Sequence, residues 1–185
     1  MKRGDSVLIC VSGGIDSMVL LDLMQGTRDG MDLRLGVIHV DHGLRKDESG
    51  SDARFVQDRC SDLFLEFHLV ELNMDPNTAN LEEEARKRRY DAIQGLRQRY
   101  AYDHAATGHT LDDQAETVLY RVIRGTGIRG LSGMEYRRPD GVIRPMLGIS
   151  RSRVSEYALQ KGIRYVNDRT NDDTRLARNL IRSEV

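Results

Sequence analysis

The chain has 185 residues, of which 39% are hydrophobic and 31% charged, and its formal net charge is −1. This length suits one domain with a short extension, and the charge excludes a protein that attracts nucleic acid through a strong overall field. No apolar stretch approaches the roughly 20 residues of a membrane-spanning helix, and no signal-peptide pattern precedes the first apolar run. We therefore expect a cytoplasmic protein that has no membrane partner.

Apolar runs typical of short strands alternate with segments of helical periodicity. Asn80 and Thr110 are each followed three positions later by an acidic residue, the pattern of a capping box at a helix start. The predicted elements are strand 7–11, helix 18–24, strand 33–40, helix 48–63, strand 64–72, helix 80–100, strand 104–107, helix 110–124, strand 142–145 and helix 150–161.

This alternation implies right-handed crossovers and a parallel sheet. The chain therefore predicts an α/β fold, a Rossmann-like doubly wound parallel sheet of about five strands. Ligands of such sheets bind outside the carboxyl ends of the strands. Functional residues are hence expected directly after the strands, in the segments 12–17, 39–45, 72–80 and 108–116.

The two cysteines, Cys10 and Cys60, lie far apart in apolar segments. They form no C-x-x-C pair of the kind that binds metal or carries out redox chemistry. Buried free thiols in a reducing compartment are the simplest interpretation. The sequence thus argues against a metal or redox site built on cysteine.

Residues 12–17 read Ser-Gly-Gly-Ile-Asp-Ser and directly follow the first predicted strand. The glycines let several backbone N–H groups point at one spot, and the next helix adds the positive end of its dipole, which together favour phosphate. Asp16 stands where the common G-x-x-x-x-G-K-[ST] loop has its lysine. A carboxylate beside phosphates needs a cation between them, so the turn suits Mg-pyrophosphate. The alternative is an ordinary serine- and glycine-rich turn with Asp16 as a helix cap.

The pattern S-G-G-x-D-S resembles the signature of the PP-loop ATP pyrophosphatases, which have an adenine nucleotide α-hydrolase-like fold. These enzymes adenylate a carbonyl oxygen with ATP and then let a nucleophile displace AMP. The resemblance implies that the hydroxyl and amide groups of the turn hold the phosphates and that the end of the second strand meets the adenosine. The implied ATP-binding residues are Ser12, Gly13, Gly14, Ile15, Asp16, Ser17, His39 and Val40.

A helix beginning near Thr110 places Asp112 and Asp113 in its first turn and Glu116 one turn later. Acidic residues in a first turn are common because the helix dipole favours them. They are also candidates to hold Mg²⁺ through oxygen ligands, or the ammonium group of a cationic substrate. The sequence leaves these interpretations open.

Four glycines crowd residues 125–133 and predict a mobile loop, which Arg124 opens. An arginine there is suited to clamp phosphates or a developing negative charge. For Arg121, which precedes it on the same helix, a solvated helix face is an equally good interpretation. Two basic sets, 87–89 and the stripe at 175, 178 and 182, are candidates for RNA contacts or solvated faces.

The run G-H-x-x-D-D-Q-x-E-T at 108–117 and the run R-G-T-G-I-R-G-L-S-G-M at 124–134 are similar to tRNA(Ile)-lysidine synthases. H-V-D-H-G-L-R at 39–45 and R-P-M-L at 144–147 agree with that family. Its members adenylate the oxygen on carbon 2 of the wobble cytidine in a CAU-anticodon tRNA(Ile). Lysine then displaces AMP, and the product is lysidine.

The resemblance implies ATP and Mg²⁺ as cofactors, and free L-lysine and tRNA(Ile) as partners. Residues 1–148 would form the PP-loop nucleotide-binding catalytic domain and 149–185 a helical extension at the start of a further region. A homodimer is consistent with the sequence. The implied catalytic residues are Asp16, Asp113 and Arg124, with metal at Asp16 and Asp113. Substrate binding is implied at Arg86, Asp112, Asp113, Glu116 and Arg124.

Two other functions stay open. A PP-loop enzyme that adds sulfur to tRNA would need reactive cysteines, which this sequence does not arrange in pairs. A nucleotide-binding module without chemistry would need the phosphate turn, but it would not explain the second acidic cluster or the glycine-rich segment.

Overall fold

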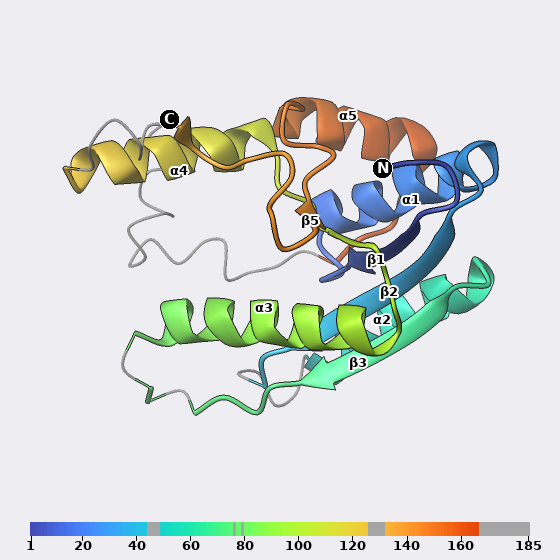
Figure 1. The fold of residues 1–185 in the computed structure, drawn as a ribbon, viewed down its shortest axis with the longest axis horizontal. Coiled ribbons are helices and arrows are strands. Elements are labelled where there is room, and N and C mark those ends of the chain that lie inside the picture. Colours follow the sequence, from blue (N-terminus) through green and yellow to red (C-terminus); the bar gives the residue numbers. More distant parts are fainter. Residues whose placement is uncertain (44–48, 76, 79, 126–131, 167–185) are drawn as a thin grey trace.

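The computed structural model describes residues 1–43, 49–75, 77–78, 80–125 and 132–166 (Figure 1). The predicted alternation of strands and helices is confirmed. The elements follow in the order β1 (Ser6–Cys10), α1 (Ile15–Met31), β2 (Arg34–Asp41), α2 (Ser49–Asp62), β3 (Glu66–Glu71), α3 (Leu81–Arg99), β4 (His104–Ala106), α4 (Leu111–Ile123), β5 (Val142–Ile143) and α5 (Arg151–Lys161).

Within the described residues, five strands form one sheet in the order β3-β2-β1-β4-β5, and all neighbouring pairs are parallel. The prediction of a parallel α/β sheet of about five strands is therefore confirmed. The chain winds outward from β1 through β2 to β3 and then returns to the other side of β1. The winding direction thus reverses between β1 and β4, which is where open α/β sheets bind their ligands.

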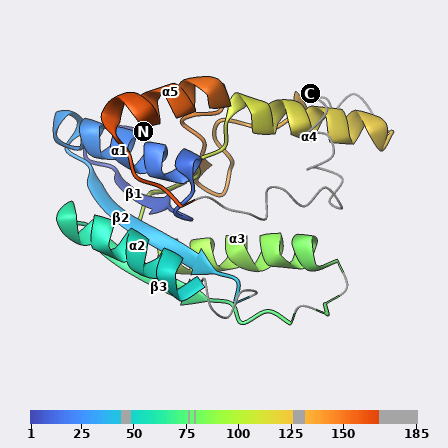
Figure 2. The ribbon, with the colours of Figure 1, turned by 180° about the vertical axis from the view of Figure 1, so that it is seen from behind.

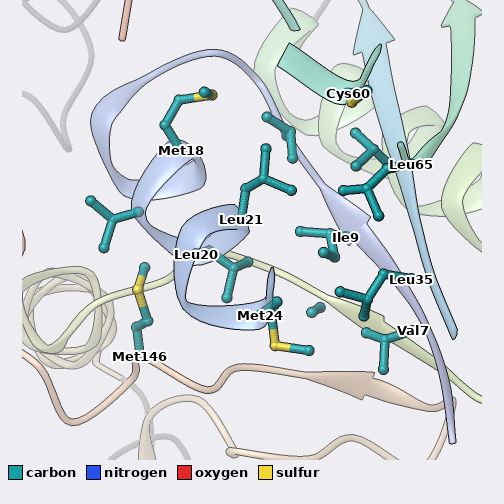
Figure 3. Close-up of a cluster of buried hydrophobic side chains, with 14 of the residues drawn as sticks. Val7, Ile9, Met18, Leu20, Leu21, Met24, Leu35, Cys60, Leu65 and Met146 are labelled. Atoms are coloured by element: carbon teal, nitrogen blue, oxygen red, sulfur yellow. The ribbon is translucent and has the colours of Figure 1, made fainter. Parts of the chain in front are cut away.

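Helices cover both faces of the sheet (Figures 1 and 2). α1, α2 and α5 share the larger core with one face, and Figure 3 shows Leu20 and Leu21 of α1 and Ile9 of β1 among its buried side chains. α3 covers the other face through Ile93, which is 1% exposed. Burying a side chain of this size stabilises the fold by roughly 1.5–3 kcal/mol. The described helices include none that could span a membrane.

α5 belongs to the larger core, because its residues Val154 and Ala158 are buried in the cluster that α1 forms with the sheet. The packing therefore continues past residue 148, where the sequence suggested a domain boundary. The boundary itself stays a prediction. Residues 126–131 of the predicted glycine-rich loop at 125–133, and the basic stripe at 175, 178 and 182, lie outside the described residues.

The clearest departures from the predicted elements are two boundaries and one helix cap. α1 runs from Ile15 to Met31 rather than over 18–24, because backbone hydrogen bonds continue the helix beyond its apolar stripe. Phe64 has φ 53° and is 89% exposed, so it lies in a turn and β3 starts at Glu66. Asn80 forms no side-chain cap, because it adopts the left-handed conformation rather than the extended one that a capping residue needs.

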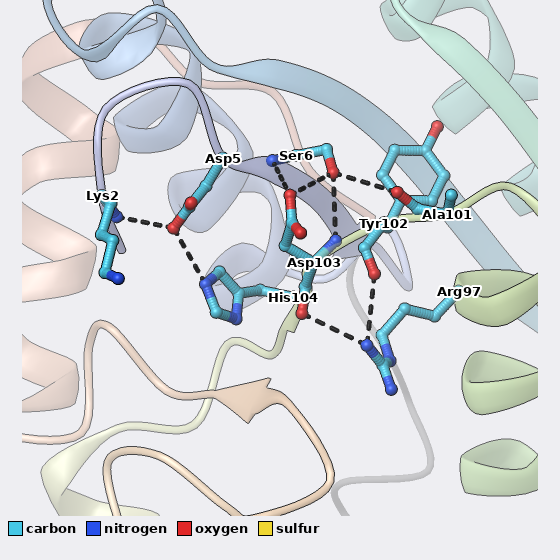
Figure 4. Close-up of polar contacts among 8 residues, drawn as sticks. All are labelled: Lys2, Asp5, Ser6, Arg97, Ala101, Tyr102, Asp103 and His104. Atoms are coloured by element: carbon cyan, nitrogen blue, oxygen red, sulfur yellow. Dashed lines mark hydrogen bonds and ion pairs between the residues drawn. The ribbon is translucent and has the colours of Figure 1, made fainter.

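A polar network ties the amino ends of β1 and β4 together (Figure 4). The amide and hydroxyl of Ser6 donate to Asp103 Oδ2 at 2.8 and 2.7 Å, and the amide of Asp103 donates back to the Ser6 hydroxyl at 3.0 Å. His104 Nε2 lies 3.0 Å from Asp5 Oδ2, which also accepts from the amide of Lys2. This network lies at the end of the strands opposite the expected ligand edge, so we assign it to stability.

Candidate functional site

The turn between β1 and α1 has the backbone geometry of an anion site. Gly13 has φ +94°, a conformation that favours glycine. Gly14 is the residue before α1 and provides no side-chain cap, so the N–H groups of the first helical turn are left for a ligand. The sequence prediction of a glycine turn that leads into a helix N-terminus is confirmed.

The two serines of the turn fix its shape. Ser17 is buried, and its hydroxyl donates to the Gly14 carbonyl at 2.8 Å while it accepts from the Ser12 amide at 3.2 Å. The hydroxyls of Ser12 and Ser17 are themselves 3.2 Å apart. Ser12 is exposed, so its hydroxyl can also reach a bound phosphate.

The turn between β1 and α1 packs against α2 on one side and against the segment after α5 on the other. A Cβ atom on Gly13 would lie 3.6 Å from Val56 and 3.7 Å from Val166. The Val166 amide donates to the Gly13 carbonyl at 2.9 Å. A hollow beside the turn, on α2, is lined by Gly50, Ser51, Arg54, Phe55 and Asp58.

Asp16 lies in the first turn of α1 and pairs with an arginine that the sequence did not indicate. Its Oδ2 accepts from Arg151 Nη2 at 3.0 Å, and its Oδ1 is buried with no hydrogen-bond partner among the described residues. Burial raises the pKa of the Asp16 carboxyl, Asp113 and Asp112 add to the rise, and Arg151 opposes it. Asp16, Asp112 and Asp113 therefore lie near one another.

The start of α4 holds its carboxylates in fixed positions. Thr110 and Asp113 form the predicted capping box: the Thr110 amide and hydroxyl donate to Asp113 Oδ2 at 2.7 and 3.0 Å. Asp112 Oδ2 accepts from the backbone amide of Arg151 at 2.7 Å and so caps α5 as well. Both residues act as helix caps, and the same bonds orient them beside Asp16.

A histidine lies between the end of β4 and the start of α4. His109 follows β4, and its Nδ1 lies 2.8 Å from the Thr107 hydroxyl. Burial lowers the pKa of His109 to about 4, with Asp113 opposing the shift and Arg144, Arg89 and Arg86 adding to it. The ring is therefore neutral near pH 7. Arg86 lies near enough to His109 to affect its charge, and its predicted role in substrate binding stays a prediction.

Not every predicted site residue joins this group. His39 is 5% exposed and donates through Nδ1 to the Val11 carbonyl at 2.9 Å, while Val40 packs on the α3 side of the sheet. Arg124 ends α4 beside the Tyr120 ring, and twelve residues of helix put it about 18 Å from Asp112. Glu116 is half-buried one turn beyond Asp112. The roles assigned to these residues stay predictions.

Two residues of the site were missed by sequence reasoning. His109 had a signal, because it stands directly after a strand at the ligand edge of the sheet. Arg151 had none, because it is 135 residues from Asp16 and begins a helix with no phosphate motif. Only the packing of α5 against α1 brings the two together.

The donor set determines what kind of cation fits. Among the described residues, no group of three or more His, Cys, Asp or Glu side chains could hold a metal by itself. Mg²⁺ commonly takes one or two carboxylates and completes its shell with phosphate oxygens and water. The unpartnered Oδ1 of Asp16, beside a phosphate turn, fits such a shared metal.

Comparisons with known proteins agree with this geometry. The family model described as the PP-loop domain matches residues 2–185. The tRNA(Ile)-lysidine synthase of Chlorobaculum tepidum is 40% identical over 189 positions, which cover all of this chain and 57% of that protein. The tRNA(Ile)-lysidine synthase of Clostridioides difficile is 33% identical over all of this chain and 41% of that protein. The chain thus spans about half the length of these relatives.

Two solved structures share the fold. The U34-tRNA thiolase NcsA from Methanococcus maripaludis, which carries a [4Fe-4S] cluster, has a TM-score of 0.76 and 25% identity over 90% of this chain and 59% of its own. The glutamine-dependent NAD⁺ synthetase from Acinetobacter baumannii has a TM-score of 0.53 and 15% identity, over 86% of this chain and 29% of its own.

Proposed function

Because the chain belongs to the PP-loop family, we propose that it carries the catalytic centre of a tRNA(Ile)-lysidine synthase. The observation that supports this most is the meeting of Asp16, in the phosphate turn, with Asp112 and Asp113 at the reversal point of the sheet. Relatives that bear that name align with the whole chain. The reaction joins lysine to carbon 2 of the wobble cytidine of a tRNA(Ile) with a CAU anticodon, at the expense of ATP.

In the first half of the reaction, the oxygen on carbon 2 of cytidine attacks the α-phosphorus of ATP. The bond from that phosphorus to the bridging oxygen breaks, and pyrophosphate leaves. The N–H groups at the start of α1, with the exposed Ser12 hydroxyl, would bind the departing phosphates. Because the turn is held by its own serines and by Val166, it binds without having to reorganise.

Asp16 is the residue we assign to Mg²⁺, with Asp113 as a second candidate ligand. When bound, the metal would neutralise charge on the phosphates and on the leaving pyrophosphate. The protein's contribution is to keep the Asp16 carboxylate at the turn, where its Oδ1 lacks any other partner among the described residues.

In the second half, an amine of free lysine attacks carbon 2, the carbon–oxygen bond breaks, and AMP leaves with that oxygen. The amine must lose a proton, for which Asp16 and Asp113 are candidates. Asp112 and Asp113, with Glu116 one turn further along α4, are the residues we propose to attract the ammonium group of lysine. Arg86 is proposed to contact the cytidine or its phosphate, and Arg124 to contact the phosphates or the cytidine.

The strongest rival is the thiolase chemistry of the M. maripaludis neighbour. A [4Fe-4S] cluster is held mainly by cysteine thiolates, and this chain has two cysteines in all. Cys10 lies on β1 and Cys60 on α2, both are free, and burial raises the pKa of each thiol to about 12. Neither forms the thiolate that sulfur transfer needs at neutral pH, so the lysidine reaction is the better proposal.

One incubation tests the function. The chain is mixed with Mg-ATP, lysine and the CAU-anticodon tRNA(Ile), and the digested tRNA is searched for lysidine by mass spectrometry. Lysidine together with lysine-dependent AMP release would support the proposal. Cleavage to ADP and orthophosphate would refute it, and nucleotide binding without lysine-dependent chemistry would favour a non-catalytic module. A cytoplasmic location and a homodimer stay predictions, which fractionation and light scattering would test.

A further inference from the structure

We propose that Arg151 is a pyrophosphate-binding residue of this site, which Asp16 holds beside the phosphate turn. This inference rests on the function proposed above and adds a residue to its machinery. Arg151 is the first residue of α5, and its guanidinium reaches the first turn of α1, where Nη2 donates to Asp16 Oδ2 at 3.0 Å. Any phosphate bound at the start of α1 lies in the immediate neighbourhood of that guanidinium.

The backbone of Arg151 is held as firmly as its side chain. Its amide donates to Asp112 Oδ2 at 2.7 Å, and the neighbouring Ile149 carbonyl accepts from the Leu111 amide at 2.9 Å. Val154, one turn further along α5, is 1% exposed in the core shared with α1. The guanidinium is therefore presented to the turn from a rigid base, which lowers the entropic cost of binding a ligand there.

The charge of the site explains what Arg151 contributes. The turn carries Asp16 where other phosphate loops carry lysine, and Asp112 and Asp113 add negative charge close by, as the raised pKa of Asp16 reflects. Acidic groups repel pyrophosphate, so the site needs a cation supplied by the protein as well as any bound metal. Arg151 supplies it from a distant point of the chain.

Arg151 also has donors to spare in a position that a ligand can reach. A guanidinium carries five N–H donors in a planar fork that matches phosphate oxygens, and Asp16 takes one of them. The side chains of Arg151 and Asp16 are 30% and 20% exposed, so their pair lies at the mouth of the site. A bound pyrophosphate can therefore accept hydrogen bonds from Arg151 without displacing α5.

Titration calorimetry of the full chain with Mg-pyrophosphate, Mg-ATP and AMP tests the assignment. Arg151→Gln should weaken binding of the first two by about tenfold or more, while the affinity for AMP, which lacks the departing phosphates, stays unchanged. Arg151→Lys should restore part of the loss, because it returns the charge without the fork. Arg153→Gln removes the same charge from an exposed position in the same helical turn and should bind like the wild type.

Two results would overturn the assignment. Wild-type affinity of Arg151→Gln for Mg-pyrophosphate would show that Arg151 does not contact it. An equal loss for AMP and for pyrophosphate would show that Arg151 only keeps α5 and Asp16 in place. If the wild-type chain bound neither Mg-ATP nor Mg-pyrophosphate, that result would refute the proposed function, and the role of Arg151 that depends on it would be refuted as well.

Discussion

The side-chain amide of Gln114 pairs with the backbone of Met134 in both directions: its Nε2 donates to the Met134 carbonyl at 3.0 Å, and its Oε1 accepts from the Met134 amide at 2.6 Å. Arg121, two turns further along α4, donates to the Gly133 carbonyl at 2.9 Å. Gly133 has φ +67°, and a Cβ atom there would lie only 2.7 Å from Gln114. Gly133 and Met134 are thus docked on α4 by two polar side chains.

Gln114→Ala should slow turnover on tRNA while Mg-ATP binding survives. The change removes both hydrogen bonds between Gln114 and Met134, each contributing about 1 kcal/mol, but touches nothing in the phosphate turn. The check is the kcat/KM for tRNA measured beside the Kd for Mg-ATP. Gln160→Ala, on the exposed side of α5, is the matched control. Parallel losses of both parameters would mean that Gln114 supports the fold as a whole rather than the response to tRNA.

Asp16→Asn should abolish pyrophosphate release. The amide keeps the shape of the side chain but loses the negative charge that a metal between it and the phosphates requires. Release is followed with a coupled pyrophosphate assay, and circular dichroism verifies that α1 is intact. An unchanged rate would rule out the metal role of Asp16.

Asp113→Ala should weaken the response to lysine more than it weakens ATP binding. Asp113 also belongs to the capping box with Thr110, so we expect a loss of about 1 kcal/mol in the free energy of unfolding. Thr110→Ser keeps a capping hydroxyl and should leave both properties intact. Equal losses in the lysine and ATP responses of Asp113→Ala would point to a metal-binding role instead.

Ser6→Ala should lower the free energy of unfolding by about 1 kcal/mol at pH 7. The change removes a buried hydroxyl, and the Asp103 carboxylate then has one hydrogen-bond donor fewer. The Ser6 hydroxyl and amide hold the pKa of Asp103 below its usual range. That stabilisation is present above the unfolded pKa and is lost as the pH falls through the folded one.

Urea unfolding at several pH values from neutral to acid measures both effects. The wild type should lose more stability on acidification than Ser6→Ala does, since the variant has less of this stabilisation to lose. Identical pH dependence in the two proteins would show that the Ser6 hydroxyl does not set the pKa of Asp103.

Replacing Cys10 and Cys60 together by alanine should leave lysine-dependent AMP release intact. Stability should fall, because Cys60 is fully buried in the larger core (Figure 3), so activity is measured well below the unfolding midpoint. Loss of activity in a variant that remains folded would favour the thiolase rival, whose chemistry depends on cysteine.

Much of this architecture could be predicted from local patterns. The apolar runs of β1 and β2 are buried on both faces, as expected of central strands in a parallel sheet. The Thr110 capping box was predictable because it involves residues three apart. The same logic was wrong at Asn80, where the backbone adopts a left-handed conformation that the capping pattern does not encode.

Local sequence determined the order of the elements and the place of the phosphate turn, because hydrophobic period, glycine content and helix caps act over a few residues. Tertiary structure decided which charges meet. The return of β4 to the free side of β1 brings Asp112 and Asp113 to Asp16, and the packing of α5 on α1 adds Arg151 from 135 residues away. Contacts between residues so far apart in the sequence depend on how the helices and strands pack to bury their apolar faces. A short sequence motif contains no information about that packing.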